Sequence, residues 1–375
     1  MTIIVVGAGL AGGTAVTELR EQGYDGRLIL IGSEIHPPYE RPPLSKGYLL
    51  GNDPIAGAFV HETPWYAEHE VDLRLATTVT ALDLAAQEIT GGERLAYDRL
   101  LLATGSSPRR FRLAEESGTP SAYLRSIEDS DRLKVAFAAG AKIAVVGAGW
   151  IGLEVTAAAR EAGCEVTVYE QAELPLLGVL GPEVARVFAD LHRAHGVDLR
   201  LGAPVTADDL READLVVVGI GAAPATELAE AAGIAVDDGV LVDAQLRTSN
   251  ASVYAIGDIA NHDHPKLGRR VRVEHWETAI EQGKTAAHNL LGGAEAYDRM
   301  PYFFTDQYDL GMEYVGSVGP DGYDRVDVDG DIDGVASDQG AFRAFWVKDD
   351  TVVAALHVND WDASDAIRES IGSTR

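Results

Sequence analysis

Two glycine-rich turns, far apart in the sequence, carry the residue spacing that binds a dinucleotide. Their glycines follow a GxGxxG pattern and are Gly7, Gly9 and Gly12 in the first turn and Gly147, Gly149 and Gly152 in the second. In such a turn the first glycine permits a tight bend, the second lets the backbone approach a pyrophosphate, and the third lets the next helix pack closely. The N-terminus of that helix favours the negative phosphates. The repetition predicts two dinucleotides, or one in each of two related domains.

An acidic residue follows each turn at a distance that suits a ribose contact. Glu34 ends the strand pattern that lies about twenty residues beyond the first turn. Glu170 ends the corresponding strand pattern after the second turn. A carboxylate at position 170 accepts hydrogen bonds from the ribose hydroxyls and repels a 2′-phosphate. The second site is therefore predicted to prefer NADH to NADPH.

Strands and helices of a repeated plan must position these residues. An apolar strand pattern precedes each turn, at residues 3–6 and 143–146, and a helical pattern follows each turn. Two further strand endings, in residues 97–110 and 246–260, lie before and after the second strand–turn–helix segment. The first domain is therefore predicted to be discontinuous and to resume near residue 244.

Composition excludes several classes of protein. The net charge of −28 argues against binding to nucleic acid or to an anionic membrane, because both require basic patches. The single cysteine, Cys164, excludes an intrachain disulfide and a dithiol redox centre, and we expect it to be a small core residue. The first residues run directly into a strand pattern, and no apolar run approaches about 18 residues. These features predict a soluble, cytoplasmic protein.

Two segments have partial metal-site patterns, and we interpret both without a metal. Residues 326–334, VDVDGDIDG, begin like an EF-hand, but Gly340 stands where the final glutamate is needed. The flanking residues alternate like strands, which predicts a solvated hairpin loop. His262 and His264 have HxH spacing without a third ligand, and we expect them in a surface loop.

The strip YERPPLSKGYL at residues 39–49 is more specific than the glycine turns. Pro42 and Pro43 fix two φ angles and remove two donors, so we expect an irregular, stiff wall without regular secondary structure. Together with EHW at residues 274–276 and DQYD at residues 306–309, the strip resembles the FAD-dependent, NADH-linked ferredoxin reductases. The matching segments span nearly the whole chain.

This resemblance implies an α/β fold with two Rossmann-like dinucleotide-binding domains, on a plan like that of glutathione reductase, and a smaller C-terminal α+β domain. The implied FAD-binding domain comprises residues 1–108 and 244–298, the NADH-binding domain residues 109–243, and the C-terminal domain residues 299–375. Related proteins carry a small β-meander where this chain has only TADDLRE, residues 206–212. The NADH-binding domain is therefore expected to be shortened.

The resemblance also assigns cofactor residues. FAD is implied to contact Gly7, Gly9, Gly12, Glu34, Arg41, Lys46, Arg125, Asp258 and Trp276, and NADH is implied to contact Gly147, Gly149, Gly152 and Glu170. Asp258 is placed on the ribitol and Trp276 beside the flavin. Phe304 occupies a position that is usually tryptophan in relatives, which weakens a role for it in electron flow.

Lys46, Glu154 and Trp276 are the predicted catalytic residues. The resemblance places Glu154 against Lys46 near flavin N5, where a cation would stabilise the charge of the reduced ring and its partner would keep that cation from being unpaired. The alternative interpretation is a structural ion pair. Two nucleotides without a redox cysteine indicate hydride transfer from nicotinamide to flavin.

The predicted function is an NADH-dependent flavoenzyme that passes electrons singly to a ferredoxin-type iron–sulfur protein. One alternative is an NADH oxidase or quinone-type reductase; another is an NADH redox sensor like apoptosis-inducing factor. An acidic ferredoxin requires a local basic patch, and two clusters qualify: Arg109, Arg110 and Arg112, and, next to Trp276, Arg269, Arg270 and Arg272. Their alternative interpretation is solvated surface. The protein is expected to be a monomer or a homodimer.

Overall fold

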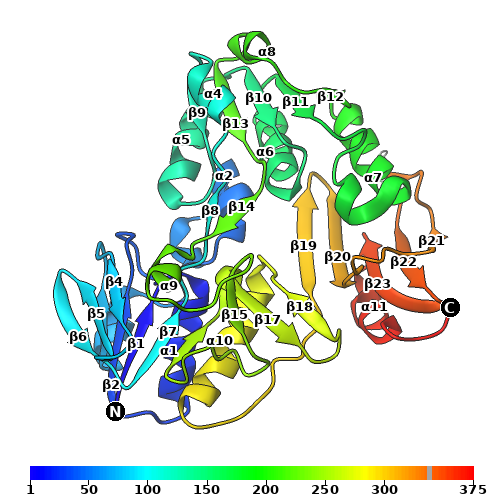
Figure 1. Ribbon diagram of the computed structural model, residues 1–375. Coiled ribbons are helices and arrows are strands. Elements are labelled where there is room, and N and C mark those ends of the chain that lie inside the picture. Colours follow the sequence, from blue (N-terminus) through cyan, green and yellow to red (C-terminus); the bar gives the residue numbers. More distant parts are fainter. Residues whose placement is uncertain (336–339) are drawn as a thin grey trace. The chain divides into compact units, whose positions relative to one another are not determined.

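The computed structural model describes residues 1–335 and 340–375 and divides them into two compact units (Figure 1). Unit 1 contains Met1–Arg41, Ile55–Ser107 and Ala223–Arg299, and unit 2 contains Pro42–Pro54, Pro108–Ala222 and Met300–Arg375. Each unit combines a parallel sheet with helices, so the predicted α/β class is confirmed. The chain passes from one unit to the other after Arg41, Pro54, Ser107, Ala222 and Arg299, and the third and fourth of these crossings lie in β8 (Ser106–Pro108) and β14 (Ala222–Pro224).

Unit 1 is built on a five-stranded parallel sheet with the order β16-β7-β1-β2-β3. The strands are β1 (Thr2–Val6), β2 (Arg27–Ile31), β3 (Val71–Arg74), β7 (Arg99–Leu102) and β16 (Val253–Ala255). The central strand β1 pairs in parallel with both β2 and β7, and Ile3, Ile4 and Val5 are fully buried. A parallel strand covered on both faces is apolar throughout, which explains the unbroken IIVV pattern.

Two long helices of unit 1 pack against each other. They are α1 (Leu10–Glu21) and α10 (Trp276–Leu290). Gly283 lies so close to α1 that a side chain there would come within 3.0 Å of the Ala11 carbonyl oxygen. The strands β16 and β7 also pair in parallel, which brings residues after Ala223 into the N-terminal sheet. Compact unit 1 is therefore assembled from segments that are separated in the sequence.

Smaller elements complete unit 1. They are η2 (Ile55–Ala58), α3 (Thr63–Glu68), α9 (Glu227–Ala231), the meander β4 (Ala81–Asp83), β5 (Glu88–Gly91) and β6 (Glu93–Ala96), the sheet β15 (Val240–Val242), β17 (Ala260–His264) and β18 (Arg269–Val271), and η3 (Gly257–Ile259). The β4-β5-β6 meander was not predicted from the sequence.

Unit 2 repeats the parallel plan with the order β12-β11-β10-β13-β9. The strands are β9 (Ser121–Ala122), β10 (Ile143–Val146), β11 (Val166–Glu170), β12 (Asp198–Leu201) and β13 (Leu215–Val218). The accompanying helices are α4 (Arg112–Glu116), α5 (Ile127–Ala138), α6 (Trp150–Glu161), α7 (Leu177–Ala194) and α8 (Ala207–Arg211). Among the helices of the described residues, none is long and apolar enough to cross a membrane.

The C-terminal part of unit 2 is an antiparallel sheet with one helix. The sheet has the order β19-β20-β23-β22-β21 and consists of β19 (Tyr302–Gln307), β20 (Leu310–Gly316), β21 (Arg325–Gly330), β22 (Phe342–Lys348) and β23 (Thr351–Val358). It is followed by η5 (Trp361–Ala363) and α11 (Ser364–Ser370). Trp346 of this sheet and Phe188 of α7 belong to one buried core.

The compact units do not follow the expected domain limits. Unit 1 resumes at Ala223, ahead of the expected residue 244, and residues 300–375 share unit 2 with the second parallel sheet. The shared core around Trp346 explains why the C-terminal sheet is not a third compact unit. The assignment of a cofactor to each stretch of the chain stays a prediction.

The strip at residues 39–49 has more secondary structure than expected. Pro42–Ser45 form the 3-10 helix η1, and Gly47–Leu50 form the short helix α2. The expectation of an irregular wall is wrong here because proline, with its fixed φ, is well suited to the first turn of a helix. Lys46 has non-helical backbone angles and lies between the two helical turns.

The segment TADDLRE forms the helix α8 between β12 and β13. The Thr206 side chain accepts from the Asp209 amide, and the Asp209 side chain accepts from the Thr206 amide. This reciprocal capping box satisfies backbone donors at the start of a one-turn helix. A threonine followed three residues later by an acid was the sequence signal for this helix.

The two partial metal patterns have different outcomes. The flanks of VDVDGDIDG form the antiparallel strands β21 and β22, as predicted, although part of the connecting loop lies outside the described residues. The prediction of a surface loop for His262 and His264 is wrong, because both are buried in β17. That strand lies between β15 and β18, and His264 Nε2 donates to the Arg299 carbonyl oxygen at 2.9 Å.

Candidate functional site

The first glycine turn joins β1 to α1 in unit 1, and its first and third glycines have steric reasons that the second lacks. Gly7 has φ +115°, and a side chain there would meet the Ala103 carbonyl oxygen at 2.1 Å. A side chain at Gly12 would meet the Gly7 carbonyl oxygen at 2.0 Å. Above Gly9, in contrast, no heavy atom lies within 4 Å of the Cβ position. The fold therefore requires Gly7 and Gly12, whereas Gly9 leaves open space at the start of α1.

The α1 N-terminus fits an anionic group. Gly9 is its N-cap residue, no side chain caps the helix, and its first turn contains no acidic residue. Unsatisfied amides and the helix dipole favour a phosphate at such a position. The geometry around Gly9 therefore suits the close approach of a pyrophosphate.

Glu34, predicted to contact a ribose, is oriented by residues of the strip. Arg41 Nη2 donates to Glu34 Oε1 at 2.8 Å, and the Tyr39 hydroxyl donates to Glu34 Oε2. Burial, together with the negative charge of Glu34, raises the pKa of Tyr39, so its hydroxyl stays protonated and able to donate. The structure thus brings the predicted residues Glu34 and Arg41 together in unit 1.

Two other predicted FAD residues also lie in unit 1. Asp258 is part of η3, and Ser106 Oγ donates to Asp258 Oδ2 at 2.7 Å. Trp276 is the first residue of α10 and is half-buried. Burial raises the pKa of the neighbouring Glu40, while a hydrogen bond from Trp276 acts in the opposite direction. Asp258 and Trp276 therefore each lie at or near the start of a helical segment.

The second turn joins β10 to α6 in unit 2 and repeats the geometry of the first. Gly147 has φ +97°, and a side chain there would lie 2.5 Å from the Gly219 carbonyl oxygen. A side chain at Gly152 would lie 2.1 Å from the Gly147 carbonyl oxygen. At Gly149 the nearest atom would be the Gly219 oxygen, at an ordinary 3.8 Å. The chain therefore has two turns that are closed at the first and third glycines and open at the second.

Glu170, the last residue of β11, is held beside the second turn. Its carboxylate accepts from the Ala148 amide at 2.8 Å and from the Ala172 amide at 2.9 Å. The Ala148 amide belongs to the glycine turn itself, so the acid and the turn are directly connected. A negative charge fixed in this place would repel a 2′-phosphate on the ribose of a bound nucleotide.

Lys46 and Glu154 form an ion pair in unit 2. Lys46 Nζ lies 2.8 Å from Glu154 Oε2, and the side chains are 19% and 5% exposed. Two hydroxyl groups also donate to the carboxylate, Ser45 Oγ to Oε2 at 2.5 Å and Thr305 Oγ1 to Oε1 at 2.6 Å. A buried carboxylate needs such partners, because an unpaired charge in a poorly solvated place is costly.

The lysine of this pair also faces β19. Lys46 Nζ lies 5.5 Å from the centre of the Phe304 ring, a cation–π distance. Burial raises the pKa of the nearby Asp306, Lys46 lowers it and Glu154 raises it. Phe304 therefore has a definite contact with the predicted catalytic lysine, which the sequence alone did not indicate.

Several residues of these clusters were missed by sequence reasoning. Ser45 and Thr305 bind Glu154, and Tyr39 binds Glu34. Ser45 and Tyr39 lie inside the strip that was singled out, and Thr305 directly precedes DQYD. The available signal for these three residues was thus their position inside or beside a specific motif. Arg125, also predicted to contact FAD, lies in unit 2 just before α5, where its amide donates to Asp129.

Cys164 lies in the core of unit 2, as predicted. Its side chain is fully buried, and burial raises the pKa of its thiol. A buried thiol with a raised pKa is a poor nucleophile. Cys164 therefore has the character of a packing residue.

The second arginine cluster is largely engaged within unit 1. Arg270 donates to the carbonyl oxygens of Val242 and Asn261. Arg272 forms ion pairs with Asp238 and Glu274, and its side chain is 12% exposed. These acids neutralise the positive charge that a docking patch would need.

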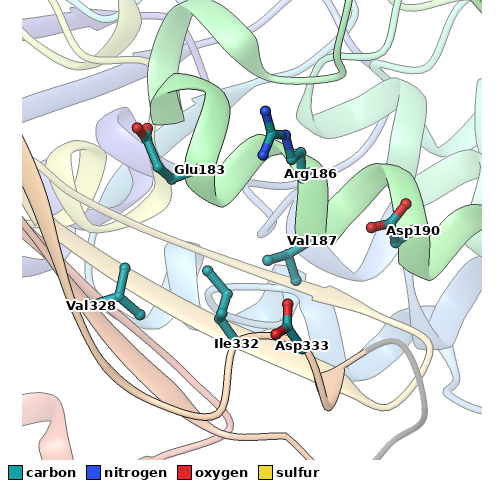
Figure 2. A pocket seen from close by; sticks show the side chains of 7 residues that line it. All are labelled: Glu183, Arg186, Val187, Asp190, Val328, Ile332 and Asp333. Carbon is teal, nitrogen blue, oxygen red and sulfur yellow. The ribbon is translucent and has the colours of Figure 1, made fainter.

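A pocket of about 330 Å³ lies in unit 2, outside the predicted nucleotide residues (Figure 2). Side chains of α7 face a segment that runs from β21 into the following turn. The lining contains Glu183, Arg186, Val187, Asp190, Val328, Ile332 and Asp333. Three carboxylates and one guanidinium make this pocket unfavourable for the phosphates of a nucleotide.

Comparison with protein families matches the chain in two parts. The pyridine nucleotide-disulphide oxidoreductase family matches residues 1–283, and the reductase C-terminal family matches residues 302–375. The first match contains both glycine turns, and the second covers the C-terminal antiparallel sheet and α11.

Individual relatives agree with this result. The ferredoxin–NAD(+) reductase component of the anthranilate 1,2-dioxygenase system of Burkholderia cepacia is 40% identical over 375 residues, covering 95% of this chain and 90% of that protein. Putidaredoxin reductase of Pseudomonas putida is 34% identical over 379 residues, covering 95% and 88%. Among solved structures, the covalent putidaredoxin reductase–putidaredoxin complex matches with a TM-score of 0.91 and 33% identity, covering 100% of this chain and 94% of that chain.

Proposed function

The chain belongs to the FAD-dependent, NADH-linked ferredoxin reductases of the pyridine nucleotide-disulphide oxidoreductase family, and we propose that it transfers electrons from NADH to a ferredoxin-type iron–sulfur protein. Relatives named ferredoxin–NAD(+) reductases and a relative complexed with putidaredoxin support this proposal. Bound FAD supplies two-electron uptake from NADH and one-electron release to the iron–sulfur acceptor. The protein is an oxidoreductase that uses FAD and NADH.

The pair of nucleotide turns carries the proposal. Each turn is closed at its first and third glycines and open at its second, Gly9 or Gly149. A chain with two such turns can bind two dinucleotides. Its only cysteine, Cys164, is buried, so this chain has no dithiol to take part in the reaction. Electron transfer without a cysteine pair is thus the chemistry that these residues support best.

The first turn is proposed to hold FAD. The uncapped α1 N-terminus would bind the pyrophosphate above Gly9, and Glu34, oriented by Arg41, would accept from the ribose. The resemblance to the family adds further contacts. The complete proposed set is Gly7, Gly9, Gly12, Glu34, Arg41, Lys46, Arg125, Asp258 and Trp276.

The second turn is proposed to hold NADH. Gly147, Gly149 and Gly152 would admit the pyrophosphate to the α6 N-terminus, and Glu170 would accept from the ribose hydroxyls. The Glu170 carboxylate already accepts two backbone amides, which keeps it in place before the nucleotide binds. Because the crossover to β13 contains only α8, we expect these contacts to carry most of the NADH affinity.

Lys46, Glu154 and Trp276 are the proposed catalytic residues. Lys46 would stabilise negative charge on the flavin, Glu154 would hold the lysine ammonium, and Trp276 would lie against the ring. The ion pair at 2.8 Å with three donors on one carboxylate supports the role of Glu154. The low exposure of both side chains, 19% for Lys46 and 5% for Glu154, distinguishes this pair from a surface ion pair.

The acceptor is proposed to be a small iron–sulfur protein. The predicted docking residues remain Arg269, Arg270 and Arg272. Arg270 and Arg272 form hydrogen bonds and ion pairs within unit 1, which weakens their attraction for an acidic partner. We propose a cytoplasmic location, supported by the near absence of cysteine. A monomer or a homodimer is proposed as the working state.

Turnover with defined acceptors tests the function. The purified FAD-loaded protein would be mixed with NADH and either a ferredoxin or dissolved oxygen alone. We expect fast NADH oxidation only when the ferredoxin is present. Fast oxygen consumption without ferredoxin would instead identify an NADH oxidase, and slow reoxidation with NADH-dependent dimerisation, seen by chromatography, would identify a redox sensor.

A further inference from the structure

A continuous series of buried hydrogen bonds leads away from Glu154 within unit 2. Thr305 Oγ1 lies 2.6 Å from Glu154 Oε1, and Gln307 Nε2 lies 3.2 Å from Thr305 Oγ1. His192 Nε2 then lies 2.9 Å from Gln307 Oε1, and the Tyr308 hydroxyl lies 3.2 Å from His192 Nδ1. The series joins α6, β19 and α7, and its members in β19 belong to or precede the DQYD motif.

The chemistry of each group gives the series one direction. An ionised Glu154 carboxylate can only accept, so the Thr305 hydroxyl donates to it and accepts from the Gln307 amide. The Gln307 oxygen then faces His192 Nε2, which must carry the proton. His192 Nδ1 is left as an acceptor for the Tyr308 hydroxyl. Every donor in the series therefore points toward the Glu154 carboxylate.

The hydrogen-bonded groups of the series are buried. Glu154 is 4% exposed, Gln307 is 1% exposed, and Thr305 and His192 are fully buried. Burial lowers the pKa of His192 to about 4, so the ring is neutral at physiological pH, as a donor–acceptor link requires. Aligned hydrogen bonds in a region of low dielectric strengthen one another.

The outer end of the series is built with backbone strain. Tyr308 has φ +55°, a left-handed conformation that is unusual for a bulky residue. Its ring stacks on His195 with a centroid distance of 3.6 Å and an interplanar angle of 8°. His195 in turn contacts the Leu191 carbonyl oxygen through Nδ1 at 2.9 Å. The hairpin between β19 and β20 therefore adopts a costly conformation that places the Tyr308 hydroxyl on His192.

We propose that His192, held in its Nε2–H form by Tyr308, is a positioning residue that fixes the orientation of the Glu154 carboxylate through Gln307 and Thr305. This proposal rests on the proposed function, because Glu154 matters for the reaction only as the partner of Lys46. It assigns His192, Gln307 and Tyr308 a part in the reaction without contact to either cofactor.

The tautomer of His192 gives a test that does not depend on activity. Protein with ¹⁵N-labelled histidine would be studied by two-dimensional NMR at pH 7, with assignment through His192→Gln. We expect the Nε2–H form in the native protein and a changed His192 signal in Glu154→Gln, where the series no longer ends on a charge. His357, also fully buried but bonded to Glu313, is the internal control and should not change. An Nδ1–H form, or a His192 signal indifferent to Glu154→Gln, would overturn the proposal.

A double-mutant cycle tests the effect on the reaction. In rapid-mixing experiments with NADH, His192→Leu should slow flavin reduction about fivefold, the effect of roughly one lost hydrogen bond. In the Glu154→Gln background, the same substitution should have no further effect. An equal loss in both backgrounds would show a general structural role and contradict the proposal. His357→Leu, a change at an equally buried histidine outside the series, is the matched control.

Other outcomes separate this proposal from the proposed function. If His192→Leu does not fold, Tyr308→Phe removes only the outermost donor, and it should show a smaller loss that Glu154→Gln also abolishes. If Glu154→Gln alone leaves flavin reduction unchanged, the proposed role of the ion pair fails, and this proposal fails with it. If Glu154→Gln slows reduction but His192→Leu and Tyr308→Phe do not, only the role of His192 is overturned.

Discussion

Lys46 Nζ lies 2.8 Å from Glu154 Oε2, although the two residues come from distant parts of the sequence. Lys46 lies between the helical turns η1 and α2, and Glu154 lies in α6, directly after the second nucleotide turn. The same carboxylate accepts from Ser45 and Thr305. Glu154, two residues after the last glycine of the proposed NADH turn, is thereby connected to the strip that is most specific for the family.

Replacement of Lys46 should slow the reductive half-reaction. In Lys46→Ala, the cation that would stabilise charge on the flavin is absent, so we expect NADH to reduce the flavin about 100-fold more slowly. The dissociation constant for NADH should change little. Rapid mixing under single-turnover conditions measures both quantities. If hydride transfer in Lys46→Ala is as fast as in the native protein, the ion pair has only a structural role.

The middle glycines should separate binding from folding. Gly9→Ala and Gly149→Ala place a methyl group in open space at φ −86° and −81°, so both proteins should fold. We expect Gly9→Ala to lose FAD and Gly149→Ala to keep FAD but raise the KM for NADH, because the methyl group would occupy the place of the pyrophosphate. Flavin absorbance and steady-state kinetics measure these effects.

The third glycines provide the control for that experiment. A methyl group at Gly12 or Gly152 would lie 2.0 or 2.1 Å from a carbonyl oxygen of the turn. Gly12→Ala and Gly152→Ala should therefore lower the thermal stability, which the substitutions at the middle glycines should not do. Unchanged FAD content and NADH kinetics in both middle-glycine variants would contradict the assignment of the two turns.

Glu170 should determine the preference between NADH and NADPH. In Glu170→Gln the charge that repels a 2′-phosphate is lost, while an oxygen remains to accept from a backbone amide. The ratio of kcat/KM for NADH to that for NADPH should fall about tenfold, equivalent to roughly 1.4 kcal/mol. The exposed Glu165, on the approach to the same strand, offers Glu165→Gln as the control. An unaltered ratio would show that Glu170 does not determine the preference for NADH.

His192 should make the stability depend on pH. Its pKa is lowered to about 4 by burial, so between its ordinary pKa of 6.5 and pH 4 the unfolded chain binds the proton more readily. The stability of the folded state therefore falls as the pH is lowered through this window, by up to about 3 kcal/mol from this residue. The contribution is unchanged above pH 7.

The His192→Leu variant isolates that contribution. Chemical denaturation at pH 7 and at pH 4.5 should show a smaller loss of stability in the variant than in the native protein. His288→Leu, at an exposed histidine of α10, should follow the native protein. An identical pH dependence in His192→Leu and native protein would mean that His192 is not neutral and buried in solution.

The arginine cluster predicts a specific effect on the acceptor. If Arg269 contributes to docking of an acidic ferredoxin, Arg269→Glu should raise the KM for ferredoxin severalfold at low salt and leave flavin reduction by NADH unchanged. Arg94→Glu, at a side chain that is 80% exposed, is the control for a change in overall charge. Equal KM values for ferredoxin in the two variants would show that Arg269 does not belong to the docking surface. Arg272→Ala, in contrast, should lower stability because its guanidinium bonds Asp238 and Glu274.

Local sequence patterns were sufficient to predict the nucleotide turns and the strands that position them. The requirement at Gly7 and Gly147 is a backbone with positive φ, and the requirement at Gly12 and Gly152 is contact with a carbonyl oxygen of the same turn. These two requirements act over a few residues, so spacing reveals them, whereas the close contacts of Gly7 with Ala103 and of Gly147 with Gly219 arise only in the folded chain. The apolar run of β1 also follows locally, from burial on both faces of a parallel sheet.

Other features depended on segments that meet only after folding. His262 and His264 looked like members of a polar loop, yet β15 and β18 pair with their strand and bury them. Thr305 and Ser45 had no pattern of their own and gained a role because both reach Glu154. Arg272 appeared as part of a basic patch and is neutralised by Glu274, two residues further along, and by Asp238 from another segment.

Fold class, the two glycine turns and the family could thus be predicted from the sequence, because glycine spacing, apolar strands and the YERPPLSKGYL strip are properties of short segments. Only the tertiary structure decided which side chains surround the Glu154 carboxylate and that donors from Thr305 to Tyr308 point toward it. Hydrogen bonds between distant segments depend on distance and orientation after packing, which no local pattern contains.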